Sequence, residues 1–311
     1  MIKIDSSMIK GLEVFLAVIE ANGVTNAQTL LNKDASVISR SLSSLEARLK
    51  LTLCERGRQG FSLTREGQQV ADEALKLFSS FRSFENRMES LGGQGSGRLA
   101  IGVIDNIIGE SCFCLDQAIA KLSDRFAGNL HIDLYVKNPY ELEKYLLDKR
   151  IDIALGIFER YQDALEYRAL YEEVDYLYAA PNNPAAKRQA QGVADTQLLE
   201  SLKQQNFAAR NFLHEADIAC LGYDLLADVS YTANLEAIAF LILSGRYVGF
   251  MPAQYAAPFV ASGRLTPILP AKIKRVSTMT LAHRRAEDKN RGIIKEALEL
   301  LLDPKLAENS K

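Results

Sequence analysis

Apolar side chains recur at helical spacing through the first 50 residues. Over residues 6–21 they lie three or four positions apart, which predicts an amphipathic helix. Residues 25–46 predict two shorter helices separated by a turn at Asn32 and Lys33. In the second of these, apolar residues at 38, 42, 45 and 49 form one stripe and leave the opposite side to solvent. This is the layout of a helix-turn-helix.

Local signals place the ends of these two helices. Thr25 and Gln28 have the spacing of a capping box at the start of the first helix, and Asp34 is in position to cap the second. Residues 51–64 follow with short apolar runs beside two glycines, which is typical of a two-stranded wing. We therefore predict a winged helix-turn-helix, rich in helix, over residues 1–65.

Residues 66–91 carry an unbroken heptad pattern of apolar positions. A seam of large apolar side chains needs a partner helix, so we interpret this segment as a linker helix that dimerises. Packing against the chain's own core is the alternative. The candidate dimerisation residues are Val70, Leu77, Phe81, Phe84 and Met88.

Beyond the run GGQGSG at 92–97, which predicts a hinge, strands alternate with helices. The first set has predicted strands at 98–103, 130–136 and 151–157 and helices at 110–126 and 139–148. The second has helices at 196–204 and 235–244 and strands at 207–211, 229–232 and 247–251. Residues 165–180 predict an extended crossing, and a strand at 275–283 and a helix at 288–302 return to the first set.

This alternation predicts an α/β domain with parallel, doubly covered sheet over residues 98–311. Subdomain 1 would comprise about 98–162 and 270–311, and subdomain 2 about 163–269. Two such halves leave a cleft at the carboxyl ends of their strands, where small ligands bind.

Charge is unevenly distributed along the chain. The net charge is -2, but residues 31–65 hold seven basic and three acidic residues, a local net charge of +4. That segment has the basic footprint that DNA requires.

Several classes of protein are not indicated. The four cysteines show no regular pairing, no signal-peptide core opens the chain, and no stretch is long and apolar enough for a membrane span, so we expect a cytoplasmic protein with no membrane partner. His131, His214 and His283 have no metal-ligand spacing, and no nucleophile elbow or phosphate loop occurs. We expect no metal site, no cofactor and no enzymatic activity.

Motifs in a fixed order along the chain resemble one family, the LysR-type transcriptional regulators. They are Thr25-x-Ala27, Ser36-x-x-Ser39-Arg40, Leu45-Glu46, Arg56, Leu63-Thr64-x-x-Gly67, Gly97-x-Leu99-x-Ile101-Gly102, Leu146-x-x-x-Arg150-Ile151-Asp152-Ile153-Ala154 and the run from Leu243 to Pro252. The resemblance implies a winged helix-turn-helix, a dimerising linker helix and a periplasmic-binding-protein-like effector domain of two subdomains. It implies operator DNA, a small-molecule effector and a homodimer or homotetramer as partners, with RNA polymerase as a further candidate.

Two departures from the family pattern bear on base readout. The family often has Gln where Ala35 stands and Ala where Gln28 stands, so readout is expected to fall more on the serines and arginine of the second helix. Lys50 and Cys54 replace the Gly and Phe usual near the wing. The candidate DNA-binding residues are Ser36, Ser39, Arg40, Ser43, Arg56 and Arg58.

Effector candidates come from the ends of the predicted strands. They are Asp105, Asn106, Lys137, Asn138, Arg210, Thr232 and Asn234. The start of the helix at 235–244 would favour an anion. The family often has Ser or Thr at 105 and 106, so a carboxylate here favours a cationic or polyol ligand, or lowers anion affinity.

Three alternatives stay open beside an effector-responsive regulator. One is a solute-binding protein that uses only the two-lobed domain. The second is an enzyme, against which the lack of a catalytic constellation counts. The third is a redox-responsive regulator that uses Cys112 and Cys114, although cysteines two apart on a helix face different sides.

Overall fold

A computed structural model divides the chain into two compact units, 1–88 with 148–150 and 89–147 with 151–311. It describes residues 4–57, 60–91, 97–109, 115–126, 129–159, 161–213, 221, 228–285 and 292–303. Outside the described residues lie most of the predicted hinge, the start of the helix predicted at 110–126, Arg58, Cys112, Cys114, His214 and Cys220.

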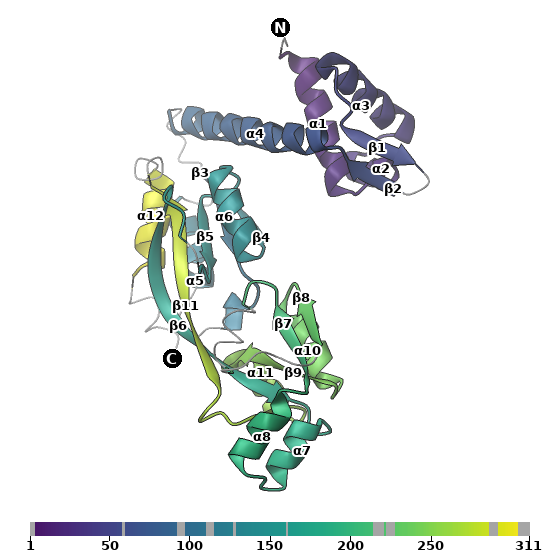
Figure 1. Cartoon of the computed structure of the whole chain (residues 1–311). Coiled ribbons are helices and arrows are strands. Elements are labelled where there is room, and N and C mark those ends of the chain that lie inside the picture. The colour runs from purple at the N-terminus through teal and green to yellow at the C-terminus, as the bar shows by residue number, and fades with distance from the viewer. Residues whose placement is uncertain are drawn as a thin grey trace. The chain divides into compact units, whose positions relative to one another are not determined.

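The first unit is a winged helix-turn-helix continued by a long helix (Figure 1). Its elements are α1 (Ser6–Glu20), α2 (Val24–Leu31), α3 (Ala35–Leu49), the antiparallel hairpin β1 (Cys54–Gly57) and β2 (Gly60–Leu63), and α4 (Arg65–Leu91). Phe15, Ile38, Leu42 and Leu45 are buried in one core, so the stripe predicted for the second helix faces inward.

The capping box predicted at Thr25 is wrong. The N-cap of α2 lies two residues earlier, at Gly23, which has no side chain to accept a hydrogen bond, and the helix begins at Val24. Thr25 therefore lies inside the first turn. Asp34 occupies the N-cap position of α3, but its side chain makes no capping bond.

Gln28 performs the capping that Asp34 does not. Its Oε1 accepts a hydrogen bond from the Ala35 N–H at 3.2 Å, while its Nε2 donates to the Thr25 carbonyl at 3.1 Å. One side chain of α2 thus satisfies a free N–H at the start of α3, which ties the two helices across the turn.

Helix α4 divides the predicted heptad seam into two parts. Val70 and Leu77 are half-buried and pack against the core of the helix-turn-helix, which is the alternative stated for this helix. Phe81, Phe84 and Met88 are instead exposed on the described surface of the single chain.

The second unit is built on one mixed sheet of nine described strands, whose order is β4-β3-β5-β11-β6-β9-β7-β8, with β10 (Thr266–Pro267) paired to β6. One end holds β3 (Gly97–Val103), β4 (Leu130–Val136) and β5 (Ile153–Gly156), with the short helix η1 (Ile107–Gly109), α5 (Leu115–Arg125) and α6 (Pro139–Leu147). The other holds β7 (Asn206–Arg210), β8 (Val229–Thr232) and β9 (Tyr247–Pro252), with α7 (Pro184–Ala190), α8 (Asp195–Leu202), α10 (Leu235–Leu243) and α11 (Ala253–Ala261).

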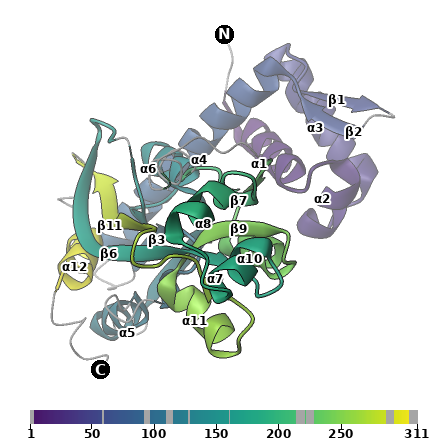
Figure 2. The same ribbon diagram turned by 60° about the horizontal axis from the view of Figure 1, so that its bottom comes forward.

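Two long strands connect these ends and correct the prediction of parallel sheet. β6 (Leu165–Ala179) and β11 (Lys274–Arg284) run antiparallel to each other, and they also pair antiparallel with β9 and β5. Only β3 with β4 and β5, and β7 with β8 and β9, are parallel among the described pairs. Figures 1 and 2 show β6 and β11 side by side along the length of this unit. We call the two ends lobe 1 and lobe 2.

Each lobe has its own apolar core. Leu99, Ile101 and Ile153 are fully buried in lobe 1, where α12 (Gly292–Leu301) adds Ile294 and Ala297. Lobe 2 has separate clusters on its two sides of the sheet. The chain therefore returns to lobe 1 at its last described helix.

Two short helices, α7 and α11, were not predicted from sequence because their alanine-rich segments show no apolar stripe. The family-like run from Leu243 has a backbone reason. Gly245 ends α10 with φ of +77°, and a Cβ there would lie 2.2 Å from the Asn182 side chain.

The family-like motif around Asp152 is also structural. The Asp152 Oδ2 accepts a hydrogen bond from the Ala100 N–H at 3.0 Å, and its Oδ1 lies 3.2 Å from Arg284. Arg284 in turn donates to the carbonyls of Leu146 and Ile151. These buried bonds hold the end of α6, and the turn that follows it, against the sheet of lobe 1.

Candidate functional site

The outward side of α3 presents the small polar residues predicted to contact DNA. Ser36, Arg40 and Ser43 are exposed and Ser39 is half-buried. The Arg40 Nε donates to the Ser36 carbonyl at 3.1 Å, so its guanidinium stays on the helix surface. Arg56 lies on strand β1, and only its backbone is described.

Two contacts fix α3 relative to its neighbours. The Glu46 Oε1 accepts hydrogen bonds from the N–H groups of Leu53, at 2.8 Å, and Cys54, which anchors the wing. Arg48 lies 2.7 Å from Asp5 at the start of α1. The hydrogen bond from Arg48, followed by that from the Met8 N–H, lowers the pKa of Asp5 to about 2. Arg48 thus forms an ion pair within the protein.

Val37 belongs to the same surface and was missed in the sequence. Its side chain is 37% exposed on α3, next to Ser36. An exposed apolar group on this helix can contact a thymine methyl in the major groove. The available signal was that Val37 falls outside the stripe of positions 38, 42 and 45.

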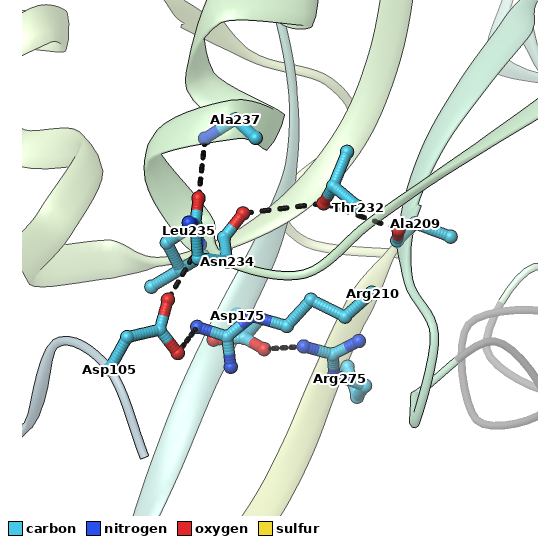
Figure 3. Close-up of polar contacts among 9 residues, drawn as sticks. All are labelled: Asp105, Asp175, Ala209, Arg210, Thr232, Asn234, Leu235, Ala237 and Arg275. Carbon is cyan, nitrogen blue, oxygen red and sulfur yellow. Dashed lines mark hydrogen bonds and ion pairs between the residues drawn. The ribbon is translucent and has the colours of Figure 1, made fainter. Parts of the chain in front are cut away.

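Asp105 joins the two lobes of the second unit. It follows β3 in lobe 1, and its Oδ1 accepts a hydrogen bond from Arg210, at the end of β7 in lobe 2, at 2.9 Å. Its Oδ2 accepts the N–H of Leu235, the first residue of α10, at 2.6 Å. Figure 3 shows this carboxylate between the guanidinium and the start of the helix. The chain's own Asp105 therefore occupies the position predicted to attract an anion.

Arg210 is almost completely buried, with 3% of its side chain exposed. Burial lowers its pKa, and the charge of Asp105 opposes this effect. The guanidinium also lies over the Phe212 ring, 5.3 Å from its centroid. Beside it, Arg275 of β11 and Asp175 of β6 form a second buried ion pair between paired strands. Each of the two arginines at this junction is therefore paired with a carboxylate of the protein.

Two further effector candidates, Asn234 and Thr232, form hydrogen bonds at the start of α10. Asn234 caps α10 by accepting from the Ala237 N–H at 2.9 Å, and the Thr232 Oγ1 donates to the Asn234 carbonyl at 3.3 Å. Asn106 is half-buried with φ of +67° in the turn after β3.

Lys137 and Asn138 lie at the start of α6. Asn138 and Glu141 form a reciprocal capping box: the Asn138 Oδ1 accepts from the Glu141 N–H at 2.9 Å, and the Glu141 Oε2 accepts from the Asn138 side chain at 2.8 Å. Lys137 pairs with the same Glu141 at 3.5 Å. The structure thus brings Asp105, Arg210 and Asn234 together. Lys137 and Asn138 instead stabilise the start of α6.

A cavity of about 500 Å³ opens near the carboxyl ends of β5, β7 and β8. We call it the cleft cavity. It is lined by Pro139, Tyr140, Glu143, Ile157, Phe158, Glu159, Gln162, Asn211, Phe212 and Tyr231. None of these was named from the sequence, because their strand ends and helix faces converge only in the folded chain.

Comparison with known families decides the identity of the two units. Residues 9–68 match the bacterial regulatory helix-turn-helix domain of the lysR family, and residues 92–303 match the LysR substrate binding domain. The chain belongs to the LysR family.

Three known LysR-family proteins show how far the similarity extends. The chain is 28% identical over 282 residues to the transcriptional activator BauR of Pseudomonas aeruginosa, covering 91% of this chain and 90% of that protein. The crystal structure of CbnR, a LysR family transcriptional regulator, superposes with a TM-score of 0.63 at 17% identity, over 97% and 98% of the two chains. The structure of LysG of Corynebacterium glutamicum, solved with bound effector Arg, superposes with a TM-score of 0.52 at 16% identity. The match covers 96% of this chain and 98% of LysG.

Membership of the LysR family confirms the predicted fold class and function. The chain is a DNA-binding transcriptional regulator with an effector-binding domain of two α/β subdomains, and it is not an enzyme. Within the described residues, no helix is long and apolar enough to cross a membrane.

Proposed function

We propose that α3 enters the major groove of operator DNA and reads it with Ser36, Ser39, Arg40 and Ser43. The exposed hydroxyls and the guanidinium on one side of this helix support the assignment. Arg56 and Arg58 of the wing would contact the phosphate backbone or the minor groove. The domain limits given above, with DNA binding assigned to residues 1–65, are part of this proposal.

The effector is proposed to bind between the lobes and to change how far they close. The observation that carries this proposal is the Asp105 carboxylate, which bonds to Arg210 and to the Leu235 N–H across the junction of the lobes. A ligand that binds one lobe arrangement better shifts the population towards it. The LysG structure, solved with bound effector Arg, shows that a protein of this fold takes a small effector.

We further propose a homodimer, assembled into a homotetramer, through the exposed part of α4. Phe81, Phe84 and Met88 follow one another on this helix and are 38%, 55% and 44% exposed. Their burial against a second α4 would remove apolar surface from water. Phe84→Glu should shift sedimentation towards smaller species, whereas Glu73→Gln on the same helix should not.

Cytoplasmic location and contact with RNA polymerase complete the proposal. Operator DNA lies in the bacterial cytoplasm, and a regulator of transcription acts on initiation by the polymerase. The redox alternative concerns Cys112 and Cys114, which lie outside the described residues, and is not part of the proposal.

A gel-shift titration at fixed salt concentration tests DNA recognition, with the DNA upstream of the chain's own gene as the probe. If Arg40 contacts a base edge, Arg40→Ala should weaken binding by about 1–3 kcal/mol. The matched control is Arg125→Ala, since Arg125 lies on α5 in the other unit and is also exposed. Equal affinities for both variants and the wild type would remove Arg40 from the interface.

A further inference from the structure

The cleft cavity has an acidic and aromatic lining. Of its ten lining residues, Glu143 and Glu159 are carboxylates, and four others carry aromatic rings. No Lys, Arg or His is among the ten. Since a carboxylate ligand would meet two like charges and no cation there, the lining disfavours an anion.

Glu143 is held in position by a hydroxyl group, and no cation of the described residues pairs with it. It lies on α6, is half-buried, and its Oε1 accepts a hydrogen bond from the Tyr167 hydroxyl at 2.5 Å. Among the described residues no Lys or Arg pairs with Glu143, and its Oε2 accepts no hydrogen bond. Burial raises the pKa of Glu143, although the hydrogen bond from Tyr167 opposes the rise. A cation at the Oε2 would stabilise this partly desolvated carboxylate.

Glu159 provides a second negative charge from a different element. It follows β5, is exposed, and makes no ion pair with a described residue. Glu143 and Glu159 line the same cavity, so one ammonium group or the two ends of a diamine can meet both.

The two helix starts near the lobe junction already have acceptors supplied by the chain itself. At α6, Asn138 and Glu141 cap each other. At α10, Asn234 accepts from the helix and Asp105 accepts from Leu235. Free N–H groups at a helix start attract anions, and here side chains of the protein accept from the N–H groups of Glu141, Leu235 and Ala237.

The aromatic rings supply surfaces that suit a cation. Phe158 is buried at 7% exposure, Phe212 is half-buried, and Tyr140 and Tyr231 are exposed at 70% and 54%. The guanidinium of Arg210 already lies 5.3 Å from the Phe212 ring centroid, on the lobe 2 side. The faces of such rings attract ammonium groups as well as guanidinium groups.

We propose that the cleft cavity binds a small organic amine in its ammonium form, with the charge held by Glu143 and Glu159 and the carbon chain against the aromatic rings. This inference rests on the proposed effector function of the same cleft. The volume suits a compact ligand such as a short alkyl amine, a diamine or a benzylic amine.

Calorimetric titration of the full-length protein with charge-matched probes tests the inference. The probes are 1,4-diaminobutane, n-butylamine and benzylamine, each compared with the alcohol and the carboxylate of the same skeleton at millimolar concentration. At least one amine should bind, and more tightly than its alcohol and carboxylate counterparts. Glu143→Gln and Glu159→Gln should each lower the affinity for that amine by about tenfold or more.

Glu200→Gln is the matched control, because Glu200 is an exposed carboxylate on α8 outside the cavity. If the Glu143→Gln variant does not fold, the amine affinity of the Glu159→Gln variant decides the test, since an exposed side chain contributes little to the stability of the fold. The inference is overturned if no amine binds, if an alcohol or carboxylate binds equally well, or if both cavity variants bind like Glu200→Gln.

A parallel gel shift separates this inference from the proposed function. If a carboxylate or alcohol binds and alters operator affinity, the cleft is an effector site and the inferred ligand class is wrong. If an amine binds with the expected loss in both variants but leaves operator affinity unchanged, the ligand class stands and effector control through this cleft fails.

Discussion

Replacing Asp105 with Asn tests the contact that joins the two lobes. The substitution keeps the size of the side chain and an oxygen that can accept from the Leu235 N–H. It removes the negative charge that neutralises Arg210, whose side chain is 3% exposed. The expected cost is therefore that of an uncompensated buried guanidinium.

The structure sets the size of this cost. Removing one partner of a buried ion pair costs about 3–5 kcal/mol. The Asp105 side chain is 22% exposed and Asp175 adds a second negative charge near Arg210, so we expect the lower end, about 3 kcal/mol. The control Asp195→Asn breaks an exposed pair with Lys272, which is worth about 0–1 kcal/mol.

Urea unfolding followed by circular dichroism measures the difference. Asp105→Asn should lower the unfolding midpoint by about 1 M relative to wild type, and Asp195→Asn should lower it much less. Adding Arg210→Met to Asp105→Asn should recover part of the loss, because the unpaired charge is then gone. Equal midpoints for Asp105→Asn and Asp195→Asn, or strictly additive losses in the double variant, would refute the reasoning.

Three further outcomes are expected. Gln28→Ala should destabilise the first unit by about 1 kcal/mol in thermal unfolding, because the Ala35 N–H loses its cap; an unchanged midpoint would contradict this role. Gly67→Ala should cost at least about 3 kcal/mol in urea unfolding, since its Cβ would lie 1.9 Å from the Leu53 carbonyl oxygen; a wild-type midpoint would refute the clash. Burial raises the pKa of Tyr178 to about 12, so the free energy of unfolding should fall as pH rises from about 10 to 12. The fall should be less steep in Tyr178→Phe. If the two proteins lose stability equally with pH, Tyr178 does not cause the pH dependence.

The elements that the sequence predicted well are those with a strong local signal. The stripe of Ile38, Leu42 and Leu45 fixes the inward face of α3, and the apolar run in β3 marks a buried strand. Helices α7 and α11 were missed because they are short and rich in alanine. The capping box at Thr25 failed because the glycine before the helix permits an earlier start.

The proposed effector site was harder to predict because the residues that meet there are distant in sequence. Asp105 and Arg210 are 105 residues apart, and strand-end reasoning named both without indicating that they bond to each other. Lys137 and Asn138 were named by the same reasoning, yet they serve the capping of α6. Glu143 was missed because a carboxylate within an amphipathic helix carries no signal of the cavity beside it.

The paired strands β6 and β11 constrain how the lobes can move. The two strands are hydrogen-bonded over most of their length, so lobe closure has to twist or bend a two-stranded ribbon and cannot pivot on a loose linker. The register shifts between Met279 and Thr280, where the ladder is interrupted and bending is easiest. If the effector closes the lobes as proposed, its binding deforms this β-ribbon elastically, and the restoring force returns the lobes to their resting angle when the ligand leaves.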